Sequence, residues 1–392
     1  MDLFTLDSQL RRTSLYDKYN SLIWTERFSS HGDFQLVINS SSATRNAFVP
    51  GTRLAVNEST RVMTVETIDD KLDSEGRALL TIKGPSLETT LHDRIAKLAM
   101  TGPNQSDKEW EITSTPAQIA RFIFDQICVQ GTLSASDILP FYTPGNMYAL
   151  DTIPEPSETT LMKIPTQTVY QAIKQICDIY GMGFRLVRNG DTSQLMFNIY
   201  MGNDRTTQQT ALSPVIFAPE LDNLTDVSYL TSSAMYKNVA YVTSPNGTRI
   251  VYGQGVDSTI TGLDRRVMYI DASDITDAAG ATLQAKLLQR GLDNLAVNTN
   301  VSAFDGEISK YSQYRYIRDY NLGDIVEIRN SDKATNHMIV TEQIMVSDEQ
   351  GERSYPTLAV KQLITPGSWY GAPATQVWDD LTSVGDNWNS RT

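Results

Sequence analysis

The chain has 392 residues, with 46 acidic and 33 basic side chains and a formal net charge of -13. This length suggests two to four folding units, and the hydrophobic content of 40% is typical of globular domains. No apolar run approaches the ~18 residues of a membrane span, and the first residues, MDLFTLDSQLRRTS, lack the apolar stretch of a signal peptide. The acidic balance argues against non-specific binding of phosphate backbones, which requires clustered Lys and Arg.

Cysteine and histidine are scarce, which limits the chemistry of any site. The two cysteines, Cys128 and Cys177, allow one disulfide at most, and each lies near the end of an expected amphipathic helix, where core packing is the favoured role. His31, His92 and His337 are far apart in the sequence, and none has a partner at metal-ligand spacing. We therefore expect no zinc site and no cofactor.

Residues 16–97 are predicted to be mostly β. Short strands are expected at 34–38, 53–56, 61–71 and 78–84. The acidic, Gly-containing turn at 73–76 lies between the last two of these β-branched runs, which is a hairpin pattern. Leu87, Leu91 and Ile95 recur at four-residue spacing and predict a helix over 85–98.

The middle of the chain combines two helices with a hairpin. Thr115 and Pro116 are typical of an N-cap and a first helical position, and Gly131 can end that helix. The proline-rich stretch 132–165 is expected to be a long loop, and a second helix is expected at about 166–180. A hairpin follows over 184–201, with a turn at 189–191. A helix followed by a hairpin, without β-α-β alternation, favours an α+β unit.

From about 211 the chain is predicted to return to strands, interrupted by one helix at about 274–290 that ends at Gly291. Strands are then expected to resume and to continue through 363. The final segment, 366–392, differs in composition because it places aromatic residues among Gly, Pro, Ser and Asp.

Two distant segments, 51–83 and 323–361, share one pattern. Each begins with Gly followed by alternating apolar residues, continues with a strand that carries Glu two positions before Ile, turns at an acidic Gly-containing stretch, and ends in a strand closed by Lys. Strand-turn-strand units converge easily, so this pattern is either a chance similarity or the sign of two related β-domains around the middle region. With two such units per chain, three chains in a ring would present six units.

Several ordered stretches resemble one known family. The stretches are YDKYNSLIWTERF at 16–28, GDFQL at 32–36, Pro-Gly at 50–51, the strand at 62–68, GPSLE at 84–88 leading to Asp93 and Arg94, GFR at 183–185, and YMGNDR at 200–205. In this order the chain resembles siphophage tail-tip hub proteins from phages of Gram-positive hosts. The likeness covers most of the chain and is weakest at 132–160 and 366–392.

This resemblance implies a non-enzymatic baseplate hub, similar in architecture to the hubs of contractile tails. The expected fold is mainly β with α+β insertions: two tail-tube-like β-barrel domains plus a smaller α/β domain. The chain then divides into a first barrel with a flanking helix, an α+β middle domain, a second barrel with a helical insertion near 274–291, and a C-terminal docking tail. The corresponding ranges are 1–98, 99–210, 211–365 and 366–392.

The same resemblance implies a homotrimeric ring that adapts a hexameric tail tube to the tail tip and encloses the DNA channel. The expected partners are the distal tail protein, the tape measure protein, and other baseplate, fibre or receptor-binding proteins. DNA would only pass through the channel in transit, because acidic side chains along the channel would repel the DNA backbone. The expected location is the virion tail tip, after synthesis in the bacterial host cytoplasm, without a membrane anchor.

No motif points to catalysis. The sequence contains no G-x-S-x-G nucleophile elbow, and the Gly-x-Gly stretches at 181–183 and 253–255 are favoured as turn glycines. Acidic pairs such as Asp69-Asp70 lie at expected hairpin tips, where solvated carboxylates are usual. We expect no enzymatic activity. The alternative function is a glycan-binding or cell-wall-degrading tail-associated protein, against which the missing signal peptide and catalytic motif both count.

The C-terminal segment supplies the candidate partner-docking residues. They are Trp369, Tyr370, Trp378, Leu381 and Trp388. Part of this set recurs at roughly helical spacing, and aromatic residues anchor many interfaces. The segment either packs on its own barrel or docks on a neighbouring subunit or another baseplate protein.

Overall fold

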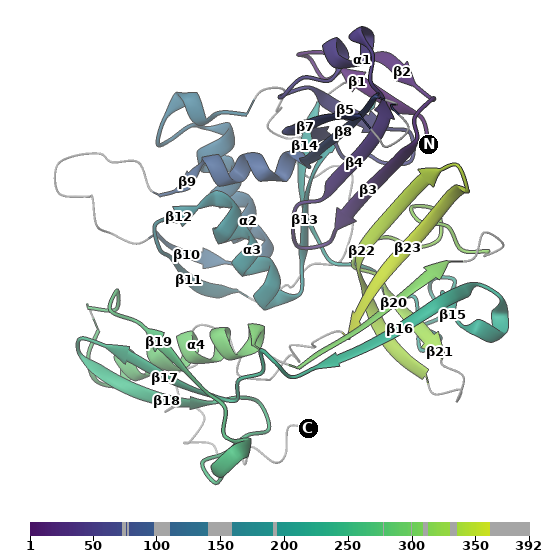
Figure 1. The fold of residues 1–392 in the computed structure, drawn as a ribbon. Coiled ribbons are helices and arrows are strands. Elements are labelled where there is room, and N and C mark those ends of the chain that lie inside the picture. Colours follow the sequence, from purple (N-terminus) through teal and green to yellow (C-terminus); the bar gives the residue numbers. More distant parts are fainter. Residues whose placement is uncertain are drawn as a thin grey trace.

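The structure is a computed structural model, and it describes residues 1–72, 76, 78–97, 110–139, 159–190, 194–276, 278–298, 300–308, 313–329 and 335–360. The fold is mainly β, as predicted, with two helix-containing units beside the strands (Figure 1). The candidate docking residues of 366–392 lie outside the described residues.

The N-terminal unit is built from strands and one short helix. Its elements are β1 (Leu3–Leu6), β2 (Arg12–Tyr16), β3 (Ser21–Arg27), β4 (Asp33–Asn39), α1 (Ser42–Ala47), β5 (Arg53–Val56), β6 (Met63–Thr64), β7 (Thr67–Leu72) and β8 (Ala78–Pro85). Strands β2, β1, β5 and β6 form a small sheet of their own, and β7 and β8 form the predicted hairpin. The predicted helix at 85–98 is instead a 3-10 helix, η1 (Leu87–Asp93), followed by the short strand β9 (Ile95–Ala96).

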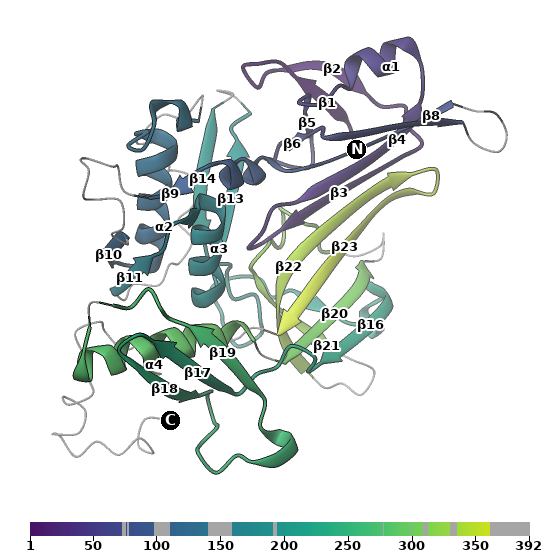
Figure 2. The same ribbon diagram turned by 60° about the vertical axis from the view of Figure 1, so that its left-hand side comes forward.

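The middle unit packs two adjacent helices against a hairpin (Figure 2). Its elements are β10 (Trp110–Ser114), α2 (Pro116–Phe124), a π-helical turn (Asp125–Val129), a 3-10 turn (Ala135–Asp137), β11 (Thr160–Ile164), β12 (Gln167–Thr168), α3 (Val169–Tyr180), β13 (Gly183–Arg188) and β14 (Leu195–Tyr200). Thr115 caps α2 as predicted, because its side chain accepts a hydrogen bond from the Gln118 amide. Thr168 caps α3, and Gly181 ends it in the left-handed conformation with φ 64°.

The C-terminal unit holds a smaller α/β insertion. Its elements are β15 (Ile216–Phe217), a 3-10 turn (Pro219–Leu221), β16 (Leu224–Ser232), β17 (Val239–Ser244), β18 (Gly247–Tyr252), a 3-10 turn (Gly262–Asp264), β19 (Val267–Asp271), α4 (Gly280–Val297), β20 (Val301–Ile308), β21 (Ile325–Arg329), β22 (Thr335–Asp348) and β23 (Gly351–Val360). Strands β18, β17 and β19 form a three-stranded sheet, and α4 packs on it. Helix α4 does not stop at Gly291 as predicted, but continues to Val297.

One sheet joins the two ends of the chain. Its main strand order is β16-β20-β23-β22-β3-β4-β8-β7, and β21 and β15 pair beside β22. The junction is the antiparallel pair β3 and β22, which lie side by side in both views although far apart in the sequence (Figures 1 and 2). Two apolar clusters pack against this sheet, one around Trp24 and Phe34 and one around Val326 and Leu358.

The two closed barrels that we expected are not found among the described residues. The sheet stays open because β7 and β16 form its two ends and do not pair with each other. The β-units at the two ends of the chain therefore share one continuous sheet through β3 and β22 rather than closing separately. The domain boundaries proposed from the sequence stay predictions.

Candidate functional site

The large sheet consists of two four-stranded units placed head to tail. The first has the order β3-β4-β8-β7, and the second has the order β16-β20-β23-β22. Counted along the chain, the first and second strands of each unit pair with each other, and the second also pairs with the fourth. The third and fourth strands form a hairpin. Of the two alternatives that the sequence left open, chance similarity or related β-units, this repeat of strand topology favours related units.

Backbone details support this equivalence. Gly51 and Gly323, the first residues of the two sequence repeats, have φ of 89° and 88°. The Gly51 amide donates to the Val65 carbonyl at 2.8 Å, and the Gly323 amide donates to the Val340 carbonyl at 2.8 Å. In each unit the valine amide returns a hydrogen bond to the carbonyl of the residue after the glycine. The structure thus aligns Val65 with Val340, one position away from the alignment with Thr341 that the sequence pattern suggests.

The first strands of the two units match as well. Trp24 on β3 is paired with Phe34 on β4. Tyr229 on β16 is paired with Phe304 on β20. An aromatic pair thus occupies the same register position in both units.

The head-to-tail arrangement leaves two open edges. Strand β22 ends the second unit and pairs with β3, which begins the first. Strand β7 ends the first unit and β16 begins the second, and within the described residues the outer edge of each is unpaired. An unpaired strand edge exposes a row of backbone donors and acceptors that can bind another strand. The candidate site is therefore an assembly surface with two complementary edges.

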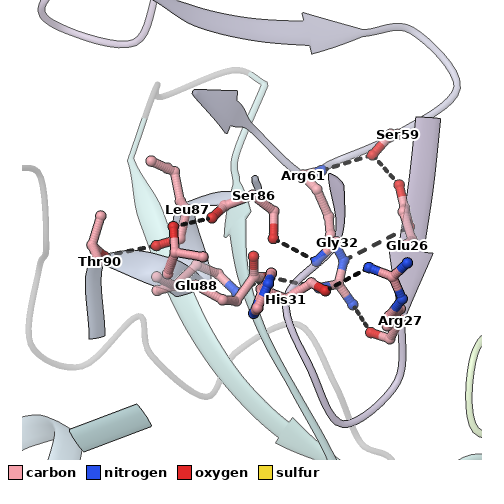
Figure 3. Close-up of polar contacts among 12 residues, drawn as sticks. Glu26, Arg27, His31, Gly32, Ser59, Arg61, Ser86, Leu87, Glu88 and Thr90 are labelled. Carbon is pink, nitrogen blue, oxygen red and sulfur yellow. Dashed lines mark hydrogen bonds and ion pairs between the residues drawn. The ribbon is translucent and has the colours of Figure 1, made fainter. Parts of the chain in front are cut away.

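A buried ionic cluster lies behind this sheet, where the N-terminal and middle units meet (Figure 3). Arg61 Nη1 donates to Glu88 Oε1 at 2.7 Å, and Arg61 Nε lies 3.8 Å from Glu26 Oε2. The three side chains are 2%, 0% and 5% exposed, respectively. Glu88 Oε1 also accepts from the Leu186 amide of β13 at 2.9 Å. Burial is the largest single influence on Arg61 and opposes its charged form, but Glu88, Glu26 and the neighbouring tyrosines together outweigh it, so the pKa of Arg61 lies above its ordinary value.

The cluster reaches into the C-terminal unit through Glu26. The Tyr316 hydroxyl donates to Glu26 Oε2 at 2.8 Å, and the indole of Trp24 donates to Glu26 Oε1 at 3.3 Å. The Ser59 hydroxyl donates to the same Oε1 atom (Figure 3). Side chains of the N-terminal and C-terminal units and the Leu186 amide of the middle unit thus meet around two buried carboxylates, which fixes how the units sit on one another.

The turn between β3 and β4 fits into the same junction. Phe28 packs against Gly183 of the middle unit and Gly323 of the C-terminal unit, and a Cβ at either glycine would lie 2.3 Å from the Phe28 ring. The Phe28 carbonyl accepts from the Phe184 amide, and the Phe28 amide donates to the Thr341 carbonyl. Glycine is required at both positions because the ring approaches the backbone so closely.

Two of the three histidines meet at this turn, which the sequence did not indicate. The rings of His31 and His92 are 6.1 Å apart, and His31 Nδ1 lies 3.0 Å from the Tyr170 hydroxyl. His92 stacks on Tyr170 at 3.8 Å. Burial lowers the pKa of His31 most, and the neighbouring His92 and Arg27 lower it further.

The other predicted features can be placed as follows. Cys128 and Cys177 are buried free thiols in the core of the middle unit, as predicted, and burial raises the pKa of Cys128 to about 12. In the described part of the chain, His, Cys, Asp and Glu form no group of three that could hold a metal ion. No helix of the described ranges is long and apolar enough to span a membrane.

The sequence does not indicate the ionic cluster, because its members are distant from one another along the chain. Arg61 follows an exposed loop, and Glu88 begins a segment with apolar spacing, so neither stands out as a buried ion. One sequence feature could have indicated Glu88. It lies in the GPSLE stretch beside Leu87, at a position where the helical pattern would place it next to the buried face.

Solved structures share this architecture. The tail protein from Neisseria meningitidis MC58 superposes with a TM-score of 0.52 at 12% identity, over 94% of this chain and 98% of that one. The 43 kDa tail protein of prophage MuSo2 from Shewanella oneidensis superposes with a TM-score of 0.50 at 13% identity, over 92% of this chain and 96% of that one. The fold is therefore that of phage tail proteins.

The sequence comparison is more specific. The Siphovirus ReqiPepy6 Gp37-like protein family matches residues 2–358, and the chain belongs to that family. No curated protein matches the sequence.

Proposed function

We propose that this protein is a structural hub at the distal end of a phage tail, assembled as a homotrimeric ring around the DNA channel. The observation that carries the proposal is the tandem sheet with complementary open edges, β7 and β16. The tail-protein fold and the siphovirus family support a location in the virion tail, and we assign the tip.

The β3–β22 junction provides the template for the contact between chains. It already joins the last strand of one unit to the first strand of another. Strand β7 is equivalent to β22, and β16 is equivalent to β3, so β7 of one chain can pair with β16 of the next in the same antiparallel way. Such a head-to-tail contact closes into a ring when the rotation from one chain to the next is a whole fraction of a full turn. Three chains then present six units, which matches the sixfold symmetry expected of the tail tube.

Charged residues on β7 make this pairing selective. Asp69, Asp70 and Lys71 follow one another on the open edge, and Lys71 forms an ion pair with Asp69. Charges on an edge strand oppose indiscriminate pairing. A partner strand must therefore offer matching side chains, which another copy of this chain can do.

The template also fixes the register of the contact. In the junction within the chain, Val346 on β22 is paired with Ile23 on β3. The equivalent residues at the open edges are Lys71 and Ser228. We therefore expect Lys71 of one chain to lie opposite Ser228 of its neighbour.

Cysteine cross-linking tests this register. A variant with Lys71→Cys and Ser228→Cys should form disulfide-linked trimers under mild oxidation, because paired residues lie within the ~4.4–6.8 Å Cα separation of a disulfide. A control with Lys71→Cys and Thr231→Cys is displaced by three positions and should remain uncrosslinked. The two native thiols are buried, so they do not interfere. Failure of the matched pair in a protein that light scattering shows to be trimeric would exclude this contact.

The remaining assignments come from the resemblance to tail-tip hub proteins. Its partners would be the distal tail protein above it, the end of the tape measure protein inside it, and fibre or receptor-binding proteins around it. The role is structural rather than enzymatic. A peptidoglycan zymogram separates it from the cell-wall-degrading alternative, because clear lysis by the purified chain would refute a purely structural role.

A further inference from the structure

The ten-stranded sheet has one face that belongs to none of the apolar clusters of the described residues. Along β4 and along β22 from Glu342 onward, buried residues alternate with half-buried or exposed ones. The buried set, which includes Phe34, Leu36 and Met345, packs in the core. Cross-strand pairing places the other set on one continuous surface, because antiparallel partners share a face. We call this surface the open face. Its members include Ser21, Ile23, Thr25, Gln35, Val37, Thr81, Ile344, Val346 and Thr357.

Acidic residues outnumber basic ones on the open face. Cross-strand register places four basic residues of the described strands there, Arg27, Lys71, Lys83 and Arg353. The acidic residues that it places there include Asp33, Asp69, Asp305, Glu307, Glu342 and Asp348. The open face therefore carries part of the acidic excess of the chain, which is -13 in total.

Most of the cations on the open face are held by carboxylates. Arg27 is held on two sides, with Nη1 2.5 Å from Asp33 Oδ2 and Nε 2.5 Å from Glu342 Oε2. Arg353 pairs with Asp348, and Lys71 pairs with Asp69. The side chain of Arg27 is still 31% exposed, and those of Asp33 and Glu342 are 50% and 21% exposed. The guanidinium is thus accessible from solvent but occupied.

We propose that the Arg27–Asp33–Glu342 triplet masks a cation on the surface along which DNA passes. The proposal rests on the proposed ring, in which the open face lines the channel. An unpaired guanidinium makes strong bidentate contacts with phosphate, and each chain in the ring would repeat that contact. Two carboxylates compensate the charge of Arg27, so the duplex passes over the open face without being held by this guanidinium.

Unmasking Arg27 tests this directly with the full-length protein. The probe is a fluorescein-labelled 30-base-pair duplex, and its anisotropy is measured at low and moderate salt. The wild type should bind weakly. The Asp33→Asn, Glu342→Gln variant should bind more tightly, and log K should fall more steeply with log salt by about 0.9 for each additional phosphate that the protein neutralises. Adding Arg27→Gln to that variant should return binding to the wild-type level.

A matched control separates masking from bulk charge. Glu58→Gln with Glu220→Gln removes the same formal charge from exposed positions off this sheet and should leave DNA binding unchanged. Equal increases in affinity in the control and the unmasked variant, or an increase that survives Arg27→Gln, would overturn the proposal. So would tight binding by the wild type.

Two further measurements keep the outcomes distinct. Should the double variant misfold by circular dichroism, Asp33→Asn alone is the replacement, since Asp33 is half exposed, and it must show the same direction of change. Light scattering on the same samples reports assembly. A monomeric wild type would refute the ring, whereas the anisotropy comparison still decides whether Arg27 is masked.

Discussion

The buried Glu26–Arg61–Glu88 cluster offers the sharpest test of how the units are held together. Replacing Glu88 with Gln preserves shape and an acceptor for the Leu186 amide, but it removes the charge that lies 2.7 Å from Arg61. Arg61 is then left with Glu26 at 3.8 Å as its only carboxylate partner among the described residues. Breaking a buried pair by removing one partner costs about 3–5 kcal/mol. Because Glu26 still offsets part of the charge, we expect a loss of about 3 kcal/mol in the free energy of unfolding.

Urea denaturation followed by tryptophan fluorescence measures this loss. Trp24, which donates a hydrogen bond to Glu26, is one of the five tryptophans whose summed emission follows unfolding. The matched control is Glu111→Gln, which breaks an ion pair with Lys163 at a glutamate that is 51% exposed. Exposed pairs contribute about 0–1 kcal/mol, so the control should shift the midpoint little.

A double-mutant cycle completes the argument. Arg61→Met and Glu88→Met should each be strongly destabilising, and the double variant should cost less than the sum, because it leaves no unpaired charge between these two positions. Additive effects would show that the two side chains act independently. A loss below about 1 kcal/mol for Glu88→Gln would place the pair in the range of surface pairs and refute the reasoning.

Three further predictions concern individual side chains of the core and of helix α4. Cys128 and Cys177 should not react with a thiol reagent in the folded protein at pH 8, because both are buried and burial raises the pKa of each thiol. Both should react in urea. Fast reaction of the native protein would contradict the assigned packing. Burial raises the pKa of Asp293 to about 6, so ionisation of this carboxyl lowers the free energy of unfolding as the pH rises through about 4 to 6. Asp293→Asn should therefore raise the melting temperature at pH 8 and not at pH 4. Equal effects at the two pH values would refute this. A Gly-to-Ala change inside a helix usually stabilises it by about 1 kcal/mol. At Gly291 the added Cβ would lie 2.5 Å from a Val251 methyl, so we expect Gly291→Ala to destabilise the protein by about 1–3 kcal/mol in thermal melts. A stabilised variant would show that the contact is loose.

Local sequence rules predicted the elements that depend on local physics. The cap at Thr115, the second helix expected at about 166–180 and the hairpin of β13 and β14 all follow from residues near one another in the chain. Tertiary contacts decided the exceptions. Helix α4 passes through Gly291 because the glycine allows close approach to β18.

The candidate site was accessible from the sequence only in outline. The repeat around Gly51 and Gly323 was visible as a pattern that allowed either chance similarity or two related β-units, and the strand topology favours the second. Pattern alone could not show that the units join through β3 and β22, since strand pairing over such a distance has no local signature. The same is true of the contact between Arg61 and Glu88, which unites residues from separate elements.

The joining of β3 to β22 also has a consequence for synthesis. Arg27 and Glu342 are 315 positions apart, so a ribosome adding about 5–20 residues per second needs roughly 16–63 seconds to make one after the other. Throughout that interval the outer edge of β3 is without its partner, and the nearest β22 strand can belong to an older chain on the same message. A chain that captures a neighbour's strand in this way would carry a native contact between the wrong copies. The order of translation therefore favours a β3 strand that stays unpaired at its outer edge until β22 has been made. The N-terminal unit should gain protection from hydrogen exchange only when residue 348 has left the ribosome.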